Sequence, residues 1–124
     1  MLLAKSPLRY PGGKAKAIPQ IINYLPAHFT EYREPFVGGG SLFIYLKQCR
    51  PDLEYWINDL NIDLYYFWLF SKEENQNLYD EVWKLKRNYL EGRKLFERLT
   101  KQKVEELSGL ERAVRFFVLN RITF

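Results

Sequence analysis

The sequence predicts an α/β fold, the start of a doubly wound, Rossmann-like parallel sheet followed by an all-helical segment. Two short strand patterns alternate with helical patterns between residues 18 and 70, and a glycine turn follows the first strand. After residue 70 only helical periodicity is present. Such an alternation is typical of parallel sheets covered by helices. Because two strands cannot bury both faces of a sheet, we expect an incomplete domain.

The first elements follow from apolar spacing and from proline positions. Residues 6–14 are expected to form a loop that contains Pro11-Gly12-Gly13. Apolar residues recur at helical spacing over residues 18–25, and Pro26 ends that helix. A strand is then expected over residues 32–37.

The glycine turn and the next strand complete this first part. Gly38-Gly39-Gly40 is expected to be a sharp turn, with Ser41 as the cap of a helix that runs to about Gln48. Cys49, at the helix end, is expected to be a small buried side chain. A second strand is expected over residues 53–58, and a further helix from there through Phe70.

The remainder of the chain is expected to be helical. From Asn75 onward the apolar residues keep a helical period, and Gly92 and Gly109 are expected as helix breaks, which gives two or three helices. A change of composition near residue 71 predicts a domain boundary, with domains at residues 1–70 and 71–124.

Composition and charge exclude several classes of protein. The chain has 124 residues, of which 47% are hydrophobic and 17% aromatic, so a disordered chain is excluded. No apolar run is long enough to cross a membrane, and the N-terminus does not have the pattern of a signal peptide. One Cys and one His make neither an internal disulfide nor a zinc site, so we expect a cytoplasmic protein without a metal.

The glycine turn lies where parallel sheets bind nucleotide-like ligands. A dinucleotide fingerprint requires a further glycine where Phe43 stands, and a phosphate-binding P-loop requires Ser or Thr where Ala15 stands. The turn therefore suits a ligand with ribose and adenine but without a pyrophosphate. Asp59 follows Gly40 by nineteen residues, at the end of the second strand, where a carboxylate accepts hydrogen bonds from ribose hydroxyls. The alternative role for Asp59 is a helix cap.

Three sequence blocks together resemble the Dam-type adenine-specific DNA methyltransferases. They are Arg9-Tyr10-Pro11-Gly12-Gly13-Lys14, Glu34-Pro35-Phe36-Val37-Gly38-Gly39-Gly40-Ser41 and Asn58-Asp59-Leu60-Asn61. Residues 112–124 also resemble the helix that precedes a DNA-contacting loop in that family. The resemblance therefore extends over the whole chain.

The resemblance implies that these blocks bind S-adenosylmethionine. Tyr10 would form an aromatic wall, and Gly12, Gly13 and Lys14 would close over the methionine end. The segment Phe36, Val37, Gly38, Gly39, Gly40 and Ser41 would surround the methionine and ribose. Asp59 would bind the ribose hydroxyls, and Leu60 would lie against the adenine. Aromatic, glycine and carboxylate groups also suit a cationic, ribose-bearing ligand on physical grounds.

The catalytic segment of that family, Asp-Pro-Pro-Tyr, does not occur in the sequence, because no two of its six prolines are adjacent. We therefore expect the N-terminal part of an adenine-specific DNA methyltransferase, inactive by itself and missing a C-terminal half. Two alternatives remain open. One is a non-catalytic helical module that binds nucleic acid or protein and has a purely structural glycine turn. The other is an enzyme that uses another adenosine cofactor such as NAD, and Phe43 at the position of the fingerprint glycine disfavours this alternative.

Double-stranded DNA is the expected partner of the intact enzyme. Residues 84–103 carry eight basic side chains against two acidic ones, and further arginines lie near the chain end. Arg9 and Arg121 are the best individual candidates for DNA contacts. Lysines and arginines on phosphates position a protein on DNA without specifying sequence. The alternative is an ordinary solvated helix surface.

Overall fold

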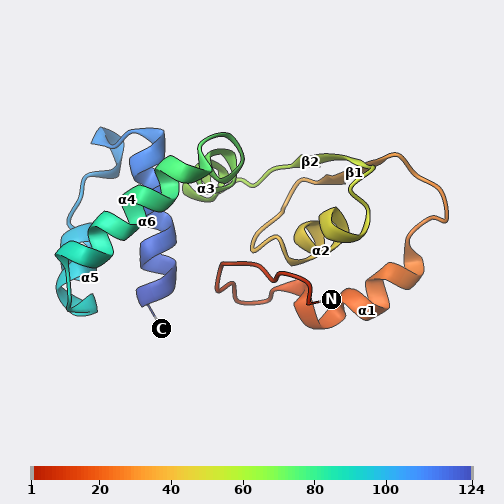
Figure 1. The fold of residues 1–124 in the computed structure, drawn as a ribbon, viewed down its shortest axis with the longest axis horizontal. Helices are drawn as coiled ribbons and strands as arrows, with labels where there is room; N and C mark the ends of the chain where they lie inside the picture. The colour runs from red at the N-terminus through yellow and green to blue at the C-terminus, as the bar shows by residue number, and fades with distance from the viewer. Residues whose placement is uncertain (1, 124) are drawn as a thin grey trace. The chain divides into compact units, whose positions relative to one another are not determined.

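The computed structural model describes residues 2–123, which form two compact units that divide after Leu60. Figure 1 shows the elements of each unit in chain order. Met1, the start of the N-terminal stretch, and Phe124, the end of the 112–124 block, lie outside the described residues.

The first unit begins with a loop and a helical segment in three consecutive parts. They are η1 (Lys14–Ala17), α1 (Ile18–Ile21) and η2 (Ile22–Tyr24). Pro19 stands in the first turn of α1, where a missing backbone N–H breaks no hydrogen bond of the helix. The helix expected over residues 18–25 is therefore present, but much of it is wound as 3-10 helix.

The sheet of this unit has two parallel strands, β1 (Glu31–Glu34) and β2 (Glu54–Ile57). Tyr32 pairs with Tyr55, and Glu34 with Ile57. The pairing continues past the strands, where the Val37 N–H donates to the Asn58 carbonyl at 2.9 Å. The mixed helix and strand architecture with a parallel pair is confirmed, whereas the doubly wound, Rossmann-like sheet stays a prediction.

The helix α2 (Ser41–Cys49) connects the two strands. Its Leu42 and Leu46 are buried, and the Phe43 ring contacts the Tyr55 ring of β2 edge to face, with centroids 5.6 Å apart. These contacts fix the start of α2, which follows the glycine turn directly.

Two expectations about α2 are wrong. The N-cap residue is Gly40, in a left-handed conformation, and Ser41 is the first helical residue without a capping hydrogen bond. Cys49 is exposed and stands at the C-terminal end of α2.

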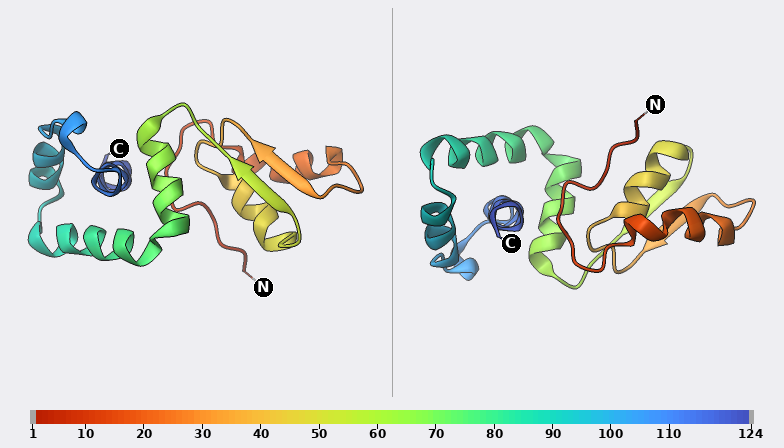
Figure 2. Two further views of the ribbon diagram at one scale, coloured as in Figure 1. Left: turned by 90° about the horizontal axis from the view of Figure 1, so that it is seen from above. Right: turned by 90° about the horizontal axis from the view of Figure 1, so that it is seen from below.

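The second unit is all-helical, as expected. It contains α3 (Ile62–Glu73), α4 (Asn75–Asn88), α5 (Gly92–Thr100), η3 (Val104–Glu106) and α6 (Gly109–Ile122). Figure 2 shows α6 nearly end-on, with α3, α4 and α5 arranged around it. Gly92 and Gly109 are the first residues of α5 and α6, so the helix break lies on the N-terminal side of each glycine.

The core of the second unit lies between α3 and α6. The Phe67 and Phe117 rings stack with centroids 5.6 Å apart, and Leu64 and Ala113 are fully buried. A Cβ on Gly109 would lie 2.9 Å from Tyr66 Cε1, so glycine permits the close approach of the two helices. Because α3 packs on α6, the compact units divide after Leu60. The functional division into residues 1–70 and 71–124 stays a prediction.

Candidate functional site

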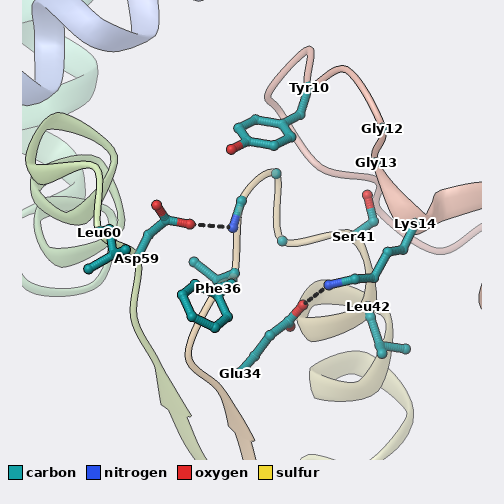
Figure 3. Close-up of a pocket in the computed structure, with 14 residues that line it drawn as sticks. Tyr10, Gly12, Gly13, Lys14, Glu34, Phe36, Ser41, Leu42, Asp59 and Leu60 are labelled. Carbon is teal, nitrogen blue, oxygen red and sulfur yellow. Dashed lines mark hydrogen bonds and ion pairs between the residues drawn. The ribbon is translucent and has the colours of Figure 1, made fainter.

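A cavity of about 360 Å³ lies in the first unit, beyond the carboxyl ends of the two parallel strands. Figure 3 shows the N-terminal loop, the glycine turn and the segment after β2 converging on it. The twelve cofactor-binding residues predicted from the sequence all line this cavity: Tyr10, Gly12, Gly13, Lys14, Phe36, Val37, Gly38, Gly39, Gly40, Ser41, Asp59 and Leu60. Glu34 and Leu42 also line it and were not assigned from the sequence.

The glycine turn takes backbone conformations that favour glycine. Gly38 has φ of +52° and Gly40 has φ of +70°, and L side chains rarely adopt this region. The Gly40 N–H donates to the Val37 carbonyl at 2.9 Å and closes the turn. The chain therefore reverses within four residues and starts α2 at the edge of the cavity.

Tyr10 forms a wall of the cavity by lying against the glycine turn. A Cβ on Gly39 would be 2.8 Å from Tyr10 Cβ, and one on Gly38 would be 3.0 Å from Tyr10 Cε1. Tyr10 is held by its own loop, since its carbonyl accepts a hydrogen bond from the Gly13 N–H at 3.1 Å. The Ser6 hydroxyl donates to the Gly39 carbonyl and ties the same loop to the turn. The aromatic wall thus depends on glycine at positions 38 and 39.

Asp59 connects the end of β2 to the glycine turn. Its Oδ2 accepts a hydrogen bond from the Gly38 N–H at 3.0 Å (Figure 3). Asp59 does not cap a helix, which was its alternative role, because the N-cap of α3 is Asn61. Asn61 Oδ1 accepts from the N–H groups of Asp63 and Leu64 at 3.1 and 3.3 Å. The Asp59 carboxylate therefore belongs to the cavity.

A second carboxylate, that of Glu34, stands at the end of β1. Only 6% of Glu34 is exposed. Its Oε1 accepts from Lys14 Nζ at 3.0 Å, and its Oε2 accepts from the Tyr32 hydroxyl at 2.8 Å. Burial, together with the hydrogen bond to Glu34 and the charge of that carboxylate, raises the pKa of Tyr32 well above its usual value. Tyr32 therefore remains a protonated donor to Glu34.

Two apolar side chains of the cavity are exposed. Phe36 is 66% exposed and Leu60 is 83% exposed, although the adjacent Val37 is buried. Large apolar side chains beside a cavity gain free energy when a ligand covers them. With two carboxylates, an aromatic wall and exposed apolar groups, the cavity suits a ligand that is cationic, hydroxyl-rich and partly aromatic.

The two predicted DNA-contacting arginines are both exposed, but they lie in different units. Arg9 precedes Tyr10 in the N-terminal loop and does not line the cavity. Arg121 stands in the last turn of α6. The structure does not test either assignment.

Sequence comparison matches residues 10–124 to the family described as D12 class N6 adenine-specific DNA methyltransferase. The chain belongs to this family. The match includes the glycine turn and Asp59, and it continues through the helices of the second unit. The cavity therefore lies in the part of the chain that matches this family.

Individual relatives agree with this family. The chain is 30% identical to the Type II methyltransferase M.MjaIII of Methanocaldococcus jannaschii, with 94% of this chain and 45% of that protein aligned. It is 32% identical to a DNA adenine methylase of Vibrio cholerae, with 94% of this chain and 40% of that protein aligned. It is also 32% identical to the DNA N-6-adenine-methyltransferase of Escherichia phage P1, with 97% of this chain and 15% of that protein aligned. The chain spans less than half the length of each of these relatives.

Two further properties concern the described residues of this chain. No helix within residues 2–123 is long and apolar enough to span a membrane. In the same range, no group of three or more His, Cys, Asp or Glu side chains is placed to hold a metal ion.

Proposed function

We propose that this chain is the cofactor-binding part of an adenine-specific DNA methyltransferase that transfers a methyl group from S-adenosylmethionine to the exocyclic amine of adenine in DNA. The observation that carries the proposal is that one cavity is lined by all twelve cofactor-binding residues predicted from the three sequence blocks. Family membership supports the reaction type.

The residues of the cavity fit S-adenosylmethionine. The Tyr10 ring lies against a glycine backbone that has no room for a Cβ, which leaves a flat aromatic wall. Such a wall suits a sulfonium cation. The Asp59 carboxylate after β2 suits ribose hydroxyls, and the Lys14 ammonium suits the carboxylate of the methionine end. No pyrophosphate-binding feature accompanies the glycine turn, so a dinucleotide fits the residues less well.

Each group has a distinct role in this proposal. The bound cofactor supplies a methyl group activated by the sulfonium. Asp59 accepts hydrogen bonds from the ribose, while it also holds the Gly38 N–H in place. Leu60 and Phe36 cover the adenine and exclude water. Lys14 and the turn at Gly12 and Gly13 close over the methionine end.

Calorimetric titration tests the cofactor assignment. We expect S-adenosylmethionine and its demethylated product to bind weakly, and NAD not to bind measurably. Asp59→Asn removes the negative charge but keeps the shape, and we expect it to weaken binding about tenfold or more. Asp52→Asn is the matched control, because Asp52 is exposed, pairs with Arg50 and does not line the cavity. A folded chain that bound none of the three ligands would favour the helical binding module with a structural glycine turn.

We further propose that the chain does not methylate DNA by itself. Methyl transfer to an exocyclic amine requires that amine to be fixed in line with the methyl group, and the Asp-Pro-Pro-Tyr segment that does this in the family is not in the sequence. The proposed complement is a C-terminal half. Incubation with tritiated cofactor and mixed-sequence duplex DNA should give no incorporation above a blank without protein. Clear incorporation by the chain alone would contradict the proposal.

Double-stranded DNA is the proposed partner, with the second unit and Arg9 as the sites of phosphate contact. The eight basic side chains at residues 84–103 support this proposal. Several of them also pair with carboxylates on the same surface: Lys84 with Glu81, Arg93 with Glu97, Lys94 with Glu91, and Lys103 with Glu106. These pairs reduce the local positive potential, so we expect weak binding. A cytoplasmic location stays a prediction.

A further inference from the structure

A hydrogen-bonded network links Tyr32 to two residues that line the cavity, Glu34 and Lys14, and the proposed function gives no role to Tyr32 or Glu34. Tyr32 and Glu34 are two residues apart on β1, so their side chains lie on the same face of the strand. Tyr32 donates to one oxygen of Glu34, and Lys14 donates to the other. Figure 3 shows the Glu34–Lys14 pair at a different side of the cavity from the Asp59 contact.

Glu34 is the one charged side chain that is buried within residues 2–123. Burying a carboxylate is costly unless its oxygens are paired and hydrogen-bonded. Here a cation and a protonated hydroxyl supply both partners, and burial keeps the Tyr32 hydroxyl protonated by raising its pKa. The carboxylate is therefore held in one position by strand β1.

Lys14 would otherwise be a mobile group. Its side chain is 50% exposed, and it follows the turn at Gly12 and Gly13. A lysine side chain has many rotamers, and ordering it on a ligand loses that freedom. The contact to the fixed Glu34 orders the ammonium at the cavity before a ligand arrives.

Tyr32 is held in place by its own neighbours. Its ring lies 5.9 Å from the ring of Tyr55 on the paired strand, and this ring contact does not use the Tyr55 hydroxyl, which donates to the Arg50 carbonyl at 2.7 Å. Tyr32 does not line the cavity, whereas Glu34 does. Any effect of the Tyr32 hydroxyl on a ligand must therefore pass through Glu34 and Lys14.

We propose that Tyr32 and Glu34 are positioning residues that fix the Lys14 ammonium for the carboxylate of the cofactor's amino-acid end. This inference rests on the proposed function, because it assigns one side of the same cavity to that end. It predicts that the network contributes to binding only when the ligand carries an amino-acid end.

Two ligands separate this role from a general structural role. S-Adenosylhomocysteine carries the amino-acid end, and 5′-methylthioadenosine has the same adenosine and thioether without it. In calorimetric titrations of the full chain, we expect Tyr32→Phe to reduce the affinity for S-adenosylhomocysteine about fivefold. The affinity for 5′-methylthioadenosine should fall less than about twofold. Glu34→Gln should show the same selectivity with a loss of about tenfold.

Tyr55→Phe is the matched control, because it removes the same hydroxyl from the paired strand position without touching Glu34. This variant should leave the affinity for both ligands unchanged, or reduce both affinities equally. Thermal unfolding of each variant verifies that it is folded, and Tyr32→Phe keeps the test decisive if Glu34→Gln does not fold.

The possible results have distinct meanings. Selective loss of S-adenosylhomocysteine in Tyr32→Phe supports the inference. An equal loss of affinity for both ligands in Tyr32→Phe, or no loss for either, overturns the inference and leaves the proposed function intact. A wild-type chain that binds neither ligand refutes the proposed function and this inference together.

Discussion

At the scale of single residues, neighbouring glycines of the turn have different physical requirements. Gly38 needs a left-handed backbone conformation, whereas Gly39 has no positive φ and needs space, because Tyr10 Cβ lies 2.8 Å from where its own Cβ would be. A methyl group at position 39 must therefore displace the aromatic wall. The backbone itself would accept the substitution.

Gly39→Ala should reduce affinity more than stability. We expect S-adenosylhomocysteine binding to weaken about tenfold, while the free energy of unfolding falls by about 1–2 kcal/mol. Calorimetry and urea unfolding measure the two effects. Gly92→Ala is the control, because no heavy atom lies within 4 Å of its added Cβ. This control should stabilise the chain by about 0.5 kcal/mol and leave affinity unchanged, and a similar affinity loss in both variants would contradict the steric explanation.

Tyr32 should make stability depend on alkaline pH. Its pKa is raised in the folded chain by burial and by Glu34, so folding favours the protonated side chain. The stability that follows is fully present below the unfolded pKa of about 10, and it is lost as the pH rises from there toward the folded pKa.

Urea unfolding between pH 8 and pH 11 checks this dependence. Above pH 10 we expect the unfolding free energy of the wild-type chain to decrease more steeply with pH than that of Tyr32→Phe. The difference should be below the limit of about 1.4 kcal/mol per pH unit for one proton, since Tyr32 is only partly buried. Equal slopes would mean that the Tyr32 proton is not linked to folding.

The residues of the cavity were largely predictable, because glycine runs and an acidic residue after a strand have specific local requirements. Glu34 was the informative omission. Its signal was available, since Glu34 stands directly before Pro35 and the glycine turn. Its ion pair with Lys14 was not predictable, because Lys14 lies twenty residues away and contacts Glu34 only in the folded chain.

At the scale of elements, the start of α3 depends on one side chain. Asn61 is the N-cap, and its Oδ1 accepts from two backbone N–H groups that have no partner within the helix. Asn61→Ala should therefore reduce the free energy of unfolding by about 1 kcal/mol. Asn88→Ala, at the exposed C-terminal end of α4, should change it by less than about 0.5 kcal/mol. Circular dichroism during urea titration measures both, and equal effects would contradict the capping role.

Element types were predictable from apolar spacing, but their exact ends were not. The strand expected over residues 32–37 ends at Glu34, because the chain turns at Pro35 and Phe36. Ser41 has the chemistry of a cap, yet the left-handed Gly40 occupies that position. The close packing of α3 on α6 depends on Gly109 meeting Tyr66, a contact between distant residues that no local pattern encodes.

At the scale of the whole molecule, the distribution of charge predicts how strongly the chain binds DNA. The net charge is +4, and several basic side chains of the second unit pair with carboxylates. We expect weak binding of a short duplex at low salt, with little dependence on its sequence. The affinity should fall steeply as salt rises, because released counterions drive the association.

Arg121→Ala tests one proposed phosphate contact. It should reduce the slope of log affinity against log salt by about 1. Arg33→Ala is the control of equal charge, since Arg33 is exposed on β1 and pairs with Glu31. Fluorescence anisotropy at several salt concentrations gives the slopes. Salt-independent binding would contradict the mechanism, and no binding at low salt would contradict the proposed DNA contact.

The hydrogen bond from the Gly38 N–H to Asp59 has a consequence for spectroscopy. Most protected amides in a protein report on backbone ladders, but this one reports on a carboxylate inside the cavity. Its proton resonance should be displaced by the nearby negative charge, and its solvent exchange should slow when a ligand restrains Asp59. One labelled glycine would thus serve as an internal reporter of cavity occupancy, readable in solution without any assay of methyl transfer.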